Sequence, residues 1–116
     1  MYQYKATVER IVDGDTMDVI VDVGFKITTN QRIRLARINT PETYNVKKDS
    51  EEYKKGMAAK EYVIQRIEAN NNEIILETDK LVGKYGRYIG TIYLADSKVT
   101  LNDELVEKGL AEYVTY

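Results

Sequence analysis

The sequence predicts an α+β fold that is mainly β, a small closed barrel of five strands accompanied by two helices. Three observations predict it: short runs of β-branched residues with alternating polarity, one long segment of helical periodicity after the third run, and turn signals between the segments. A chain of 116 residues suffices for one core that buries roughly two-thirds of the surface exposed when the chain is unfolded. We therefore expect a single domain over residues 1–116.

The first three predicted strands form an N-terminal meander over residues 4–12, 17–23 and 26–38. Asp13-Gly14, between the first two, is a hairpin turn signal. In the second strand every other residue is a valine, as expected for a strand with one buried face: Val19, Val21 and Val23. The polar stretch 44–56 then predicts a segment that is mostly exposed loop.

The helical pattern follows from about residue 51 to residue 69. Ala59, Val63 and Ile67 recur at intervals of four, so they should face the core, and three asparagines at 70–72 end the helix. Residues 73–78 and 87–94 read as two further strands.

A second, short helix is predicted near the end of the chain. Thr100 and Asp103 have the spacing of a capping box, and Gly109 should terminate the helix. The order is therefore β-β-β-α-β-β-α. Five strands interrupted by one helix after the third are typical of a Greek-key barrel of the OB type, whose closure removes free sheet edges.

The composition excludes several kinds of site. The chain has no cysteine and no histidine, which excludes disulfides, thiolate or imidazole metal sites and Ser-His-Asp triads. No apolar run approaches the ~20 residues of a membrane span, and the first ten residues lack the apolar middle of a secretion signal. We therefore expect no membrane partner and, by default, a cytoplasmic location, or a secreted one if a leader has been removed.

Positive charge is confined to two segments. The net charge of −2 argues against a uniformly basic nucleic-acid binder, but residues 30–60 carry a net +4 and residues 80–99 a net +3. These segments form a local anion site if folding brings them together. Otherwise they are ordinary solvated faces.

Four sequence blocks now resemble one known family. They are VDGDT at 12–16, RIRLARINTPET at 32–43, KYGR at 84–87 and LVEKGLA at 105–111. In matching order and similar spacing, these blocks resemble the staphylococcal nuclease (thermonuclease) family over about residues 4–112. The resemblance implies an OB-type barrel and a calcium-dependent phosphodiesterase of low specificity that hydrolyses DNA and RNA to leave 3′-phosphates. It also implies a preference for single strands, and we expect a monomer.

The resemblance places metal ligands at Asp15, Asn39 and the Thr40 carbonyl, with Asp13 assisting through water. Hard oxygen ligands suit Ca²⁺, with Mg²⁺ or Mn²⁺ as alternatives. The family usually has aspartate where this chain has Asn39, so we expect a weaker site. From the residues alone, DGDT is better explained as a tight turn, and the alternative for Asn39 is a turn residue with no metal.

For catalysis, the resemblance assigns Glu42 as the general base and Arg34 and Arg87 as the arginines that bind the scissile phosphate. A guanidinium donates two parallel hydrogen bonds to phosphate and always stays charged, although either arginine taken alone better fits an ion pair on a strand surface. The substrate pocket would be lined by four further residues: Lys84, Tyr85, Tyr113 and Tyr116.

Two arginines, Arg32 and Arg37, match no position that the family requires, so they are interpreted as surface or substrate-steering residues. The alternative to an enzyme is a catalytically weak or inactive nuclease-like module that binds single-stranded nucleic acid or a protein partner. A plain OB-type binder would leave DGDT and TPET unexplained. Because Arg34, Glu42 and Arg87 are all present, the sequence favours the enzyme.

Overall fold

The computed structural model describes residues 2–44, 46–82 and 88–115. The strands and helices follow one another along the chain in this order: β1 (Tyr2–Asp13), β2 (Thr16–Asp22), β3 (Thr28–Leu35), β4 (Ile38–Asn39), α1 (Glu51–Ala69), β5 (Glu73–Val82), β6 (Tyr88–Tyr93), α2 (Leu101–Glu107) and β7 (Glu112–Tyr113). Neither of the two helices in these residues is long and apolar enough to cross a membrane.

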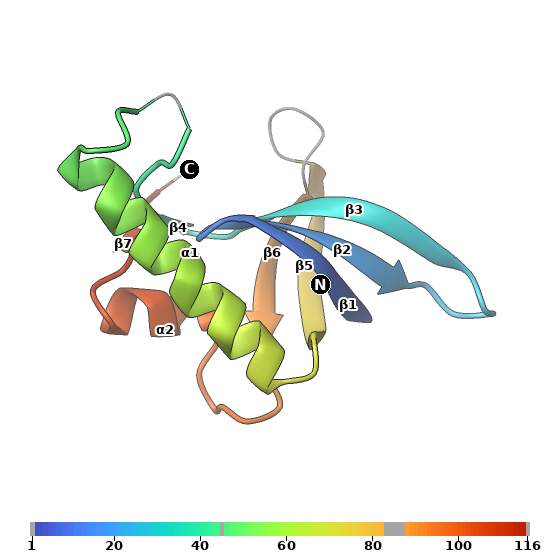
Figure 1. Ribbon diagram of the computed structural model, residues 1–116. Coiled ribbons are helices and arrows are strands. Elements are labelled where there is room, and N and C mark those ends of the chain that lie inside the picture. The colour runs from blue at the N-terminus through green and yellow to red at the C-terminus, as the bar shows by residue number, and fades with distance from the viewer. Residues whose placement is uncertain (1, 45, 83–87, 116) are drawn as a thin grey trace.

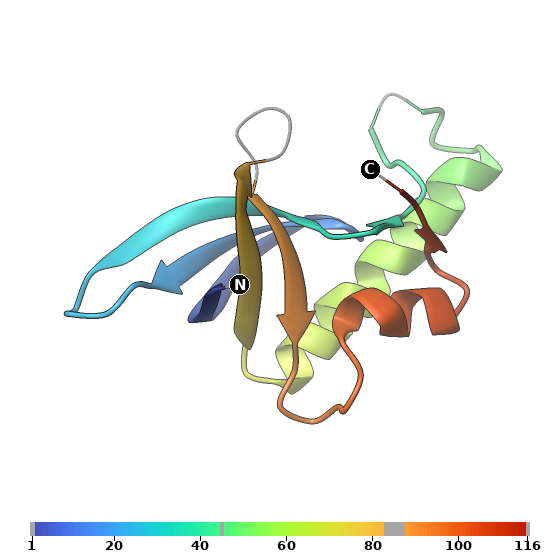
Figure 2. The same ribbon diagram turned by 180° about the vertical axis from the view of Figure 1, so that it is seen from behind.

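Five strands close into a barrel in the order β1-β2-β3-β6-β5, which confirms the predicted fold class (Figure 1). All neighbours are antiparallel except β3 and β6, which pair in parallel and close the barrel. Helix α1 runs along one side of the barrel with α2 next to it, and the β2–β3 hairpin extends away from both helices (Figure 2).

The core fills the space between the barrel and the helices. The predicted helix face is confirmed, because Ala59, Val63 and Ile67 are all buried on α1. The largest fully buried apolar side chains come from β2, β3, β4, β5, β6 and α2: Met17, Ile33, Leu35, Ile38, Leu76, Ile92, Leu101 and Leu105. Burying such side chains is the main favourable contribution to folding.

The parallel closure between β3 and β6 depends on a glycine and a buried amide. A Cβ on Gly90 would lie 2.6 Å from Leu76 Cδ1 and 3.1 Å from Ile33 Cγ2, so a larger residue here would require these core side chains to shift. Asn102 on α2 is 1% exposed. Its Oδ1 accepts from Ile92 N at 3.1 Å, and its Nδ2 donates to the carbonyls of Ala36 and Gly90 at 3.0 and 3.2 Å. This amide fixes α2 to the closing strands.

The predicted cap of α2 is confirmed, because Thr100 accepts a hydrogen bond from Asp103 N and begins the helix. The N-cap of α1, which the sequence analysis did not predict, is Ser50, whose side chain accepts from Tyr53 N. Gly109 follows α2 with φ +73°, a left-handed conformation that glycine adopts without strain.

Several strand ends differ from the sequence prediction. The third strand was expected to run to Ile38, but it ends at Leu35, because Arg37 adopts φ +63° and turns the chain before β4. Val23 was expected in the buried row, but it is 41% exposed because β2 ends at Asp22 and the hairpin continues beyond the barrel. Strand β5 was expected to end at residue 78, but it continues to Val82. Helix α1 covers the predicted range, so residues 51–56 of the polar stretch are helical.

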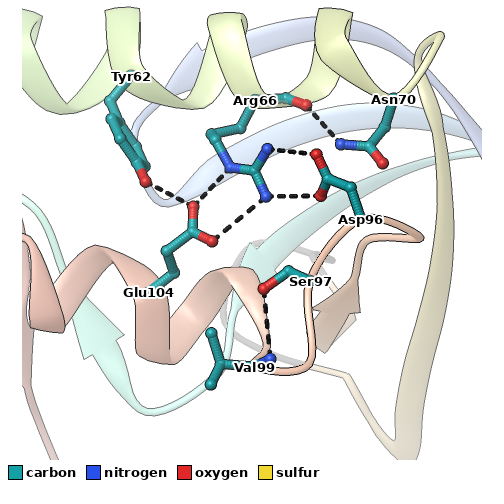
Figure 3. Close-up of polar contacts among 7 residues, drawn as sticks. All are labelled: Tyr62, Arg66, Asn70, Asp96, Ser97, Val99 and Glu104. Carbon is teal, nitrogen blue, oxygen red and sulfur yellow. Dashed lines mark hydrogen bonds and ion pairs between the residues drawn. The ribbon is translucent and has the colours of Figure 1, made fainter.

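A charged network joins the two helices (Figure 3). On α1, the Arg66 guanidinium donates to the Glu104 carboxylate of α2 at 2.7 Å and to both oxygens of Asp96 at 2.7 and 2.8 Å. Tyr62 donates to the same Glu104 carboxylate at 2.6 Å. Burial raises the pKa of Glu104, but the hydrogen bonds from Arg66 and Tyr62 outweigh burial and hold it below its ordinary value. The hydrogen bond from Arg66 lowers the pKa of Asp96 to about 2.

We predict that Arg66→Ala lowers the free energy of unfolding at neutral pH by about 2 kcal/mol, because it leaves the largely buried Glu104 carboxylate without its cationic partner. The folded pKa values of Glu104 and Asp96 lie below their ordinary values of 4.5 and 3.8. The loss should therefore be full above those values and shrink as the pH falls below them. Urea denaturation at pH 7 and pH 3 measures it.

The matched control is Gln65→Ala, at the exposed neighbouring position on α1. An equal loss of stability in both variants, or a loss from Arg66→Ala that does not change with pH, would contradict a role for the network.

Candidate active site

Several of the residues expected at the site line a cavity of about 550 Å³ at one end of the barrel. It lies where the β1–β2 turn, β3 and the segment after β4 come together. Ten residues line it: Arg10, Val12, Asp13, Asp15, Thr16, Arg32, Arg34, Asn39, Glu42 and Tyr44. The lining thus combines three arginines with three carboxylates.

Asp15 connects three segments of the chain from a position that is 8% exposed. Its Oδ2 accepts from Thr40 N at 3.1 Å, and its Oδ1 accepts from the Thr16 hydroxyl at 3.0 Å. Its backbone carbonyl accepts from Leu35 N at 2.8 Å. One residue therefore fixes the β1–β2 turn to β3 and to the segment after β4.

Arg34 directs its guanidinium toward the same carboxylate. Its Nη1 donates to the Leu35 carbonyl at 2.9 Å, which fixes the side chain along β3. Its Nη2 lies 3.0 Å from Asn39 Oδ1 and 3.4 Å from Asp15 Oδ2. Two of the three predicted metal ligands therefore turn side-chain oxygens toward one cationic nitrogen.

The oxygen donors fit a hard cation. Asp15 and Asn39 already converge on a positive group, and the buried Thr40 Oγ1 has no hydrogen-bond partner. Carboxylate and amide oxygens are ligands that Ca²⁺ accepts, with water completing the shell. Within residues 2–44, 46–82 and 88–115, however, no three acidic, histidine or cysteine side chains gather as a metal-binding group. The oxygen ligands thus match the preference of Ca²⁺, but their formal negative charge is low.

Asp13 anchors the loop that carries Glu42. The Thr43 hydroxyl donates to Asp13 Oδ1, across 30 positions of sequence. Burial raises the pKa of Asp13, and the neighbouring Asp15 carboxylate acts in the same direction against the Thr43 hydrogen bond. The sequence suggested only a water-mediated metal role for Asp13. The structure adds a direct contact beside the candidate general base.

Comparison with known sequences identifies a family for this chain. A sequence model of the family described as staphylococcal nuclease homologues matches residues 32–116. The chain belongs to this family.

Three curated relatives are similar to nearly the whole chain. The thermonuclease of Staphylococcus intermedius is 34% identical over 110 residues, which cover 94% of this chain and 59% of the relative. The micrococcal nuclease of Shigella flexneri is 29% identical over 116 residues, covering 93% and 57%. The endonuclease YhcR of Bacillus subtilis (strain 168) is 27% identical over 112 residues, covering 94% of this chain and 9% of the relative. The chain spans rather more than half of the first two relatives and about a tenth of the third.

The structure brings together five of the residues expected from the nuclease family. Arg34, Asp15, Asn39 and Glu42 line the cavity, and Thr40 contacts Asp15 directly. Four others lie outside the described residues: Lys84, Tyr85, Arg87 and Tyr116.

Tyr113 does not line the cavity. It lies on β7, opposite Ile38 of β4, and its hydroxyl donates to Asp103 of α2 at 2.9 Å. This places the ring, which is 60% exposed, beside the segment that enters the site. Its predicted contact with substrate stays a prediction.

Two glycines support the nuclease-family site: Gly14, which the sequence indicated only as a turn residue, and Gly56, which the sequence analysis did not single out. A Cβ on Gly14 would lie 2.8 Å from Ala59 Cβ and 3.0 Å from Thr40 Cγ2. A Cβ on Gly56 would lie 2.7 Å from the Pro41 carbonyl and 2.9 Å from the Glu42 carbonyl. The signal for Gly56 was a glycine inside a helical pattern, which usually has a packing reason.

We predict that Gly56→Ala displaces the loop that carries Glu42. Helix propensity alone would make this change stabilising by about 1 kcal/mol. The added Cβ instead collides with two backbone carbonyls, so we expect a loss of about 1–2 kcal/mol. Urea denaturation measures the loss, and the amide NMR shifts of Glu42 and Thr43 report the displacement.

Lys54→Ala, at an exposed position of α1, serves as the control. A stabilised Gly56→Ala protein with unshifted Glu42 and Thr43 resonances would show that the loop does not depend on this contact.

Proposed function

We propose that this chain is a metal-dependent nuclease of low specificity that hydrolyses phosphodiester bonds of DNA and RNA. The observation that carries the proposal is the convergence of the Arg34 guanidinium, the Asp15 and Asn39 oxygens and the Glu42 carboxylate on one cavity. A phosphate needs a cationic clamp, and a water nucleophile needs a base. The cavity offers both within the same lining.

In the proposed reaction, Arg34 binds the scissile phosphate and stabilises the extra negative charge of the five-coordinate phosphorus. Glu42 orients a water molecule and accepts its proton as the water oxygen bonds to phosphorus. The bond to the 5′-oxygen breaks, and that oxygen takes up a proton. The products are a 3′-phosphate and a 5′-hydroxyl.

Asp15, Asn39 and the Thr40 carbonyl would hold Ca²⁺, or Mg²⁺ or Mn²⁺ in its place. When bound, the cation supplies positive charge to a phosphate oxygen. Arg34 Nη2 contacts the same two side chains, so Arg34 would have to leave them in order to bind a phosphate. Asp15 is positioned for this role by its bonds to Thr40 and Thr16.

Arg87 lies outside the described residues. We assign it as a second ligand of the scissile phosphate on the family resemblance. Lys84, Tyr85, Tyr113 and Tyr116 are assigned to neighbouring parts of the substrate, and a monomer acting on single strands is the simplest assembly.

Two observations favour a second candidate function. Asn39 lacks the charge of an aspartate, and Arg34 is held by the residues that would bind the metal. Both features suit a catalytically weak module that binds single strands. Hydrolysis of single-stranded DNA with Ca²⁺, and its loss in EDTA, separates the enzyme from this alternative.

We predict that Glu42→Gln lowers the rate of single-stranded DNA hydrolysis in Ca²⁺ by a factor on the order of 10²–10⁴, because the amide cannot accept the water proton. Glu42 is exposed, so the melting temperature should hold. The control is Glu61→Gln, at an exposed position of α1 away from the cavity. Full activity of Glu42→Gln would remove Glu42 from the reaction.

We predict that Asn39→Asp tightens Ca²⁺ binding on the order of tenfold, because it adds a formal charge to the ligand set. The gain is partly offset, since a carboxylate also holds Arg34 Nη2 more strongly. Isothermal titration calorimetry measures the dissociation constant. Asn30→Asp adds the same charge to an exposed position of β3 outside the cavity. Equal affinities in Asn39→Asp and the unmodified protein would show that residue 39 is not a ligand.

A further inference from the structure

Two arginines and a tyrosine of the cavity have no part in the proposed reaction. Arg10 on β1, Arg32 on β3 and Tyr44 after β4 line the same cavity as Arg34 and Glu42. The Arg32 side chain is 47% exposed, and Tyr44 is 48% exposed. These three residues extend the cavity beyond the candidate catalytic groups with positive charge and one aromatic ring.

The position of Arg32 follows from the strand. Arg32 and Arg34 are alternate residues of β3 and therefore lie on the same face, ~6.6 Å apart along the strand. An extended single strand of nucleic acid separates successive phosphates by a comparable interval. A strand whose scissile phosphate lies at Arg34 therefore brings the next phosphate to Arg32.

Asp18 orients Arg32 for this contact. The Arg32 guanidinium donates from Nε at 2.7 Å and from Nη2 at 3.1 Å to the two oxygens of Asp18. In the sheet, Asp18 pairs with Arg10 on one side and with Arg32 on the other. One carboxylate thus lies between two arginines, and the row keeps a net positive charge.

Charge is also divided within the cavity. The three arginines lie within β1 and β3, whereas Asp13 is the last residue of β1, Asp15 lies in the turn that follows, and Glu42 lies on the loop after β4. A polyanion is attracted along the strands and repelled from the loop. The favourable path therefore runs over Arg32 and reaches the acidic end only at the phosphate bound by Arg34.

We propose that Arg10, Arg32 and Tyr44 form a second nucleotide subsite, in which the two arginines bind the phosphate next to the scissile one and Tyr44 stacks on the adjoining base. This proposal rests on the proposed function, since it defines the subsite relative to the phosphate at Arg34. The occupant is a single strand of DNA or RNA, because an aromatic ring can stack on any unpaired base.

The test measures binding in a Glu42→Gln background, in which cleavage is slowed, with Ca²⁺ present. The probes are oligothymidylates with one phosphate, dTpdT, and with three, the tetranucleotide. We expect the tetranucleotide to bind more tightly than dTpdT, and Arg32→Ala to reduce this gain about tenfold by removing hydrogen bonds from a charged group. The slope of log affinity against log salt for the tetranucleotide should fall by about 0.7, the value for one phosphate contact with a single strand.

Three further variants complete the experiment. Arg32→Lys should keep the salt slope and lose part of the affinity gain, because lysine retains the charge without the planar donor pair. Arg10→Ala should show a smaller loss in the same direction, and it carries the test if Arg32→Ala does not fold. Lys98→Ala, at an exposed residue outside the cavity, should change neither quantity.

If Arg32→Ala and Arg10→Ala both keep the full length-dependent gain and salt slope, Arg32 is only the partner of Asp18 and the subsite does not exist. Failure of the proposed function would be seen in a different experiment, as absence of hydrolysis by the unmodified protein with Ca²⁺. The two outcomes are distinguishable because the subsite is measured by binding alone.

Discussion

The buried carboxylate of Asp15 is the contact on which the candidate site depends. It accepts hydrogen bonds from Thr40 N and from the Thr16 hydroxyl, and it lies 3.4 Å from Arg34 Nη2. A carboxylate with so little contact with water must be satisfied by such donors. The same bonds hold the turn, β3 and the segment after β4 in fixed relation, so folding and site geometry share one interaction.

The site is built on a scaffold that restricts its movement. The barrel supplies Arg34 and Arg32 from a strand whose parallel pairing with β6 is fixed by Gly90 and Asn102. The loop of Glu42 lies directly against α1 because Gly56 has no side chain. Each functional group is therefore placed by packing against a regular element, which favours preorganised geometry.

Stability and chemistry use charge in different places. The Arg66 network joins α1 to α2 through complete pairing, in which each donor group meets a carboxylate (Figure 3). In the cavity, three arginines and three acids are only partly paired. Paired charges stabilise a structure, whereas partly exposed and unevenly distributed charges remain available for a ligand.

Features that depend only on neighbouring residues were predictable from the amino-acid sequence. Alternation in β2, the α1 face of Ala59, Val63 and Ile67, the turn at Gly14 and the Thr100 cap were all predictable, because side-chain period and capping are local properties. The family blocks likewise indicated Arg34, Asn39 and Glu42 as parts of a site.

Contacts between residues far apart in the sequence were not predictable in this way, because they depend on the complete fold. The β4–β7 pair, the Thr43 contact with Asp13 and the space for Gly56 against Pro41 join segments that no local pattern relates. The end of β3 at Leu35 was also missed, since the left-handed turn at Arg37 is set by the closure of the barrel and by the bond from Val114 N to its carbonyl. Such contacts exist only after the chain has folded, because their partners lie far apart in the sequence and closure alone brings them together.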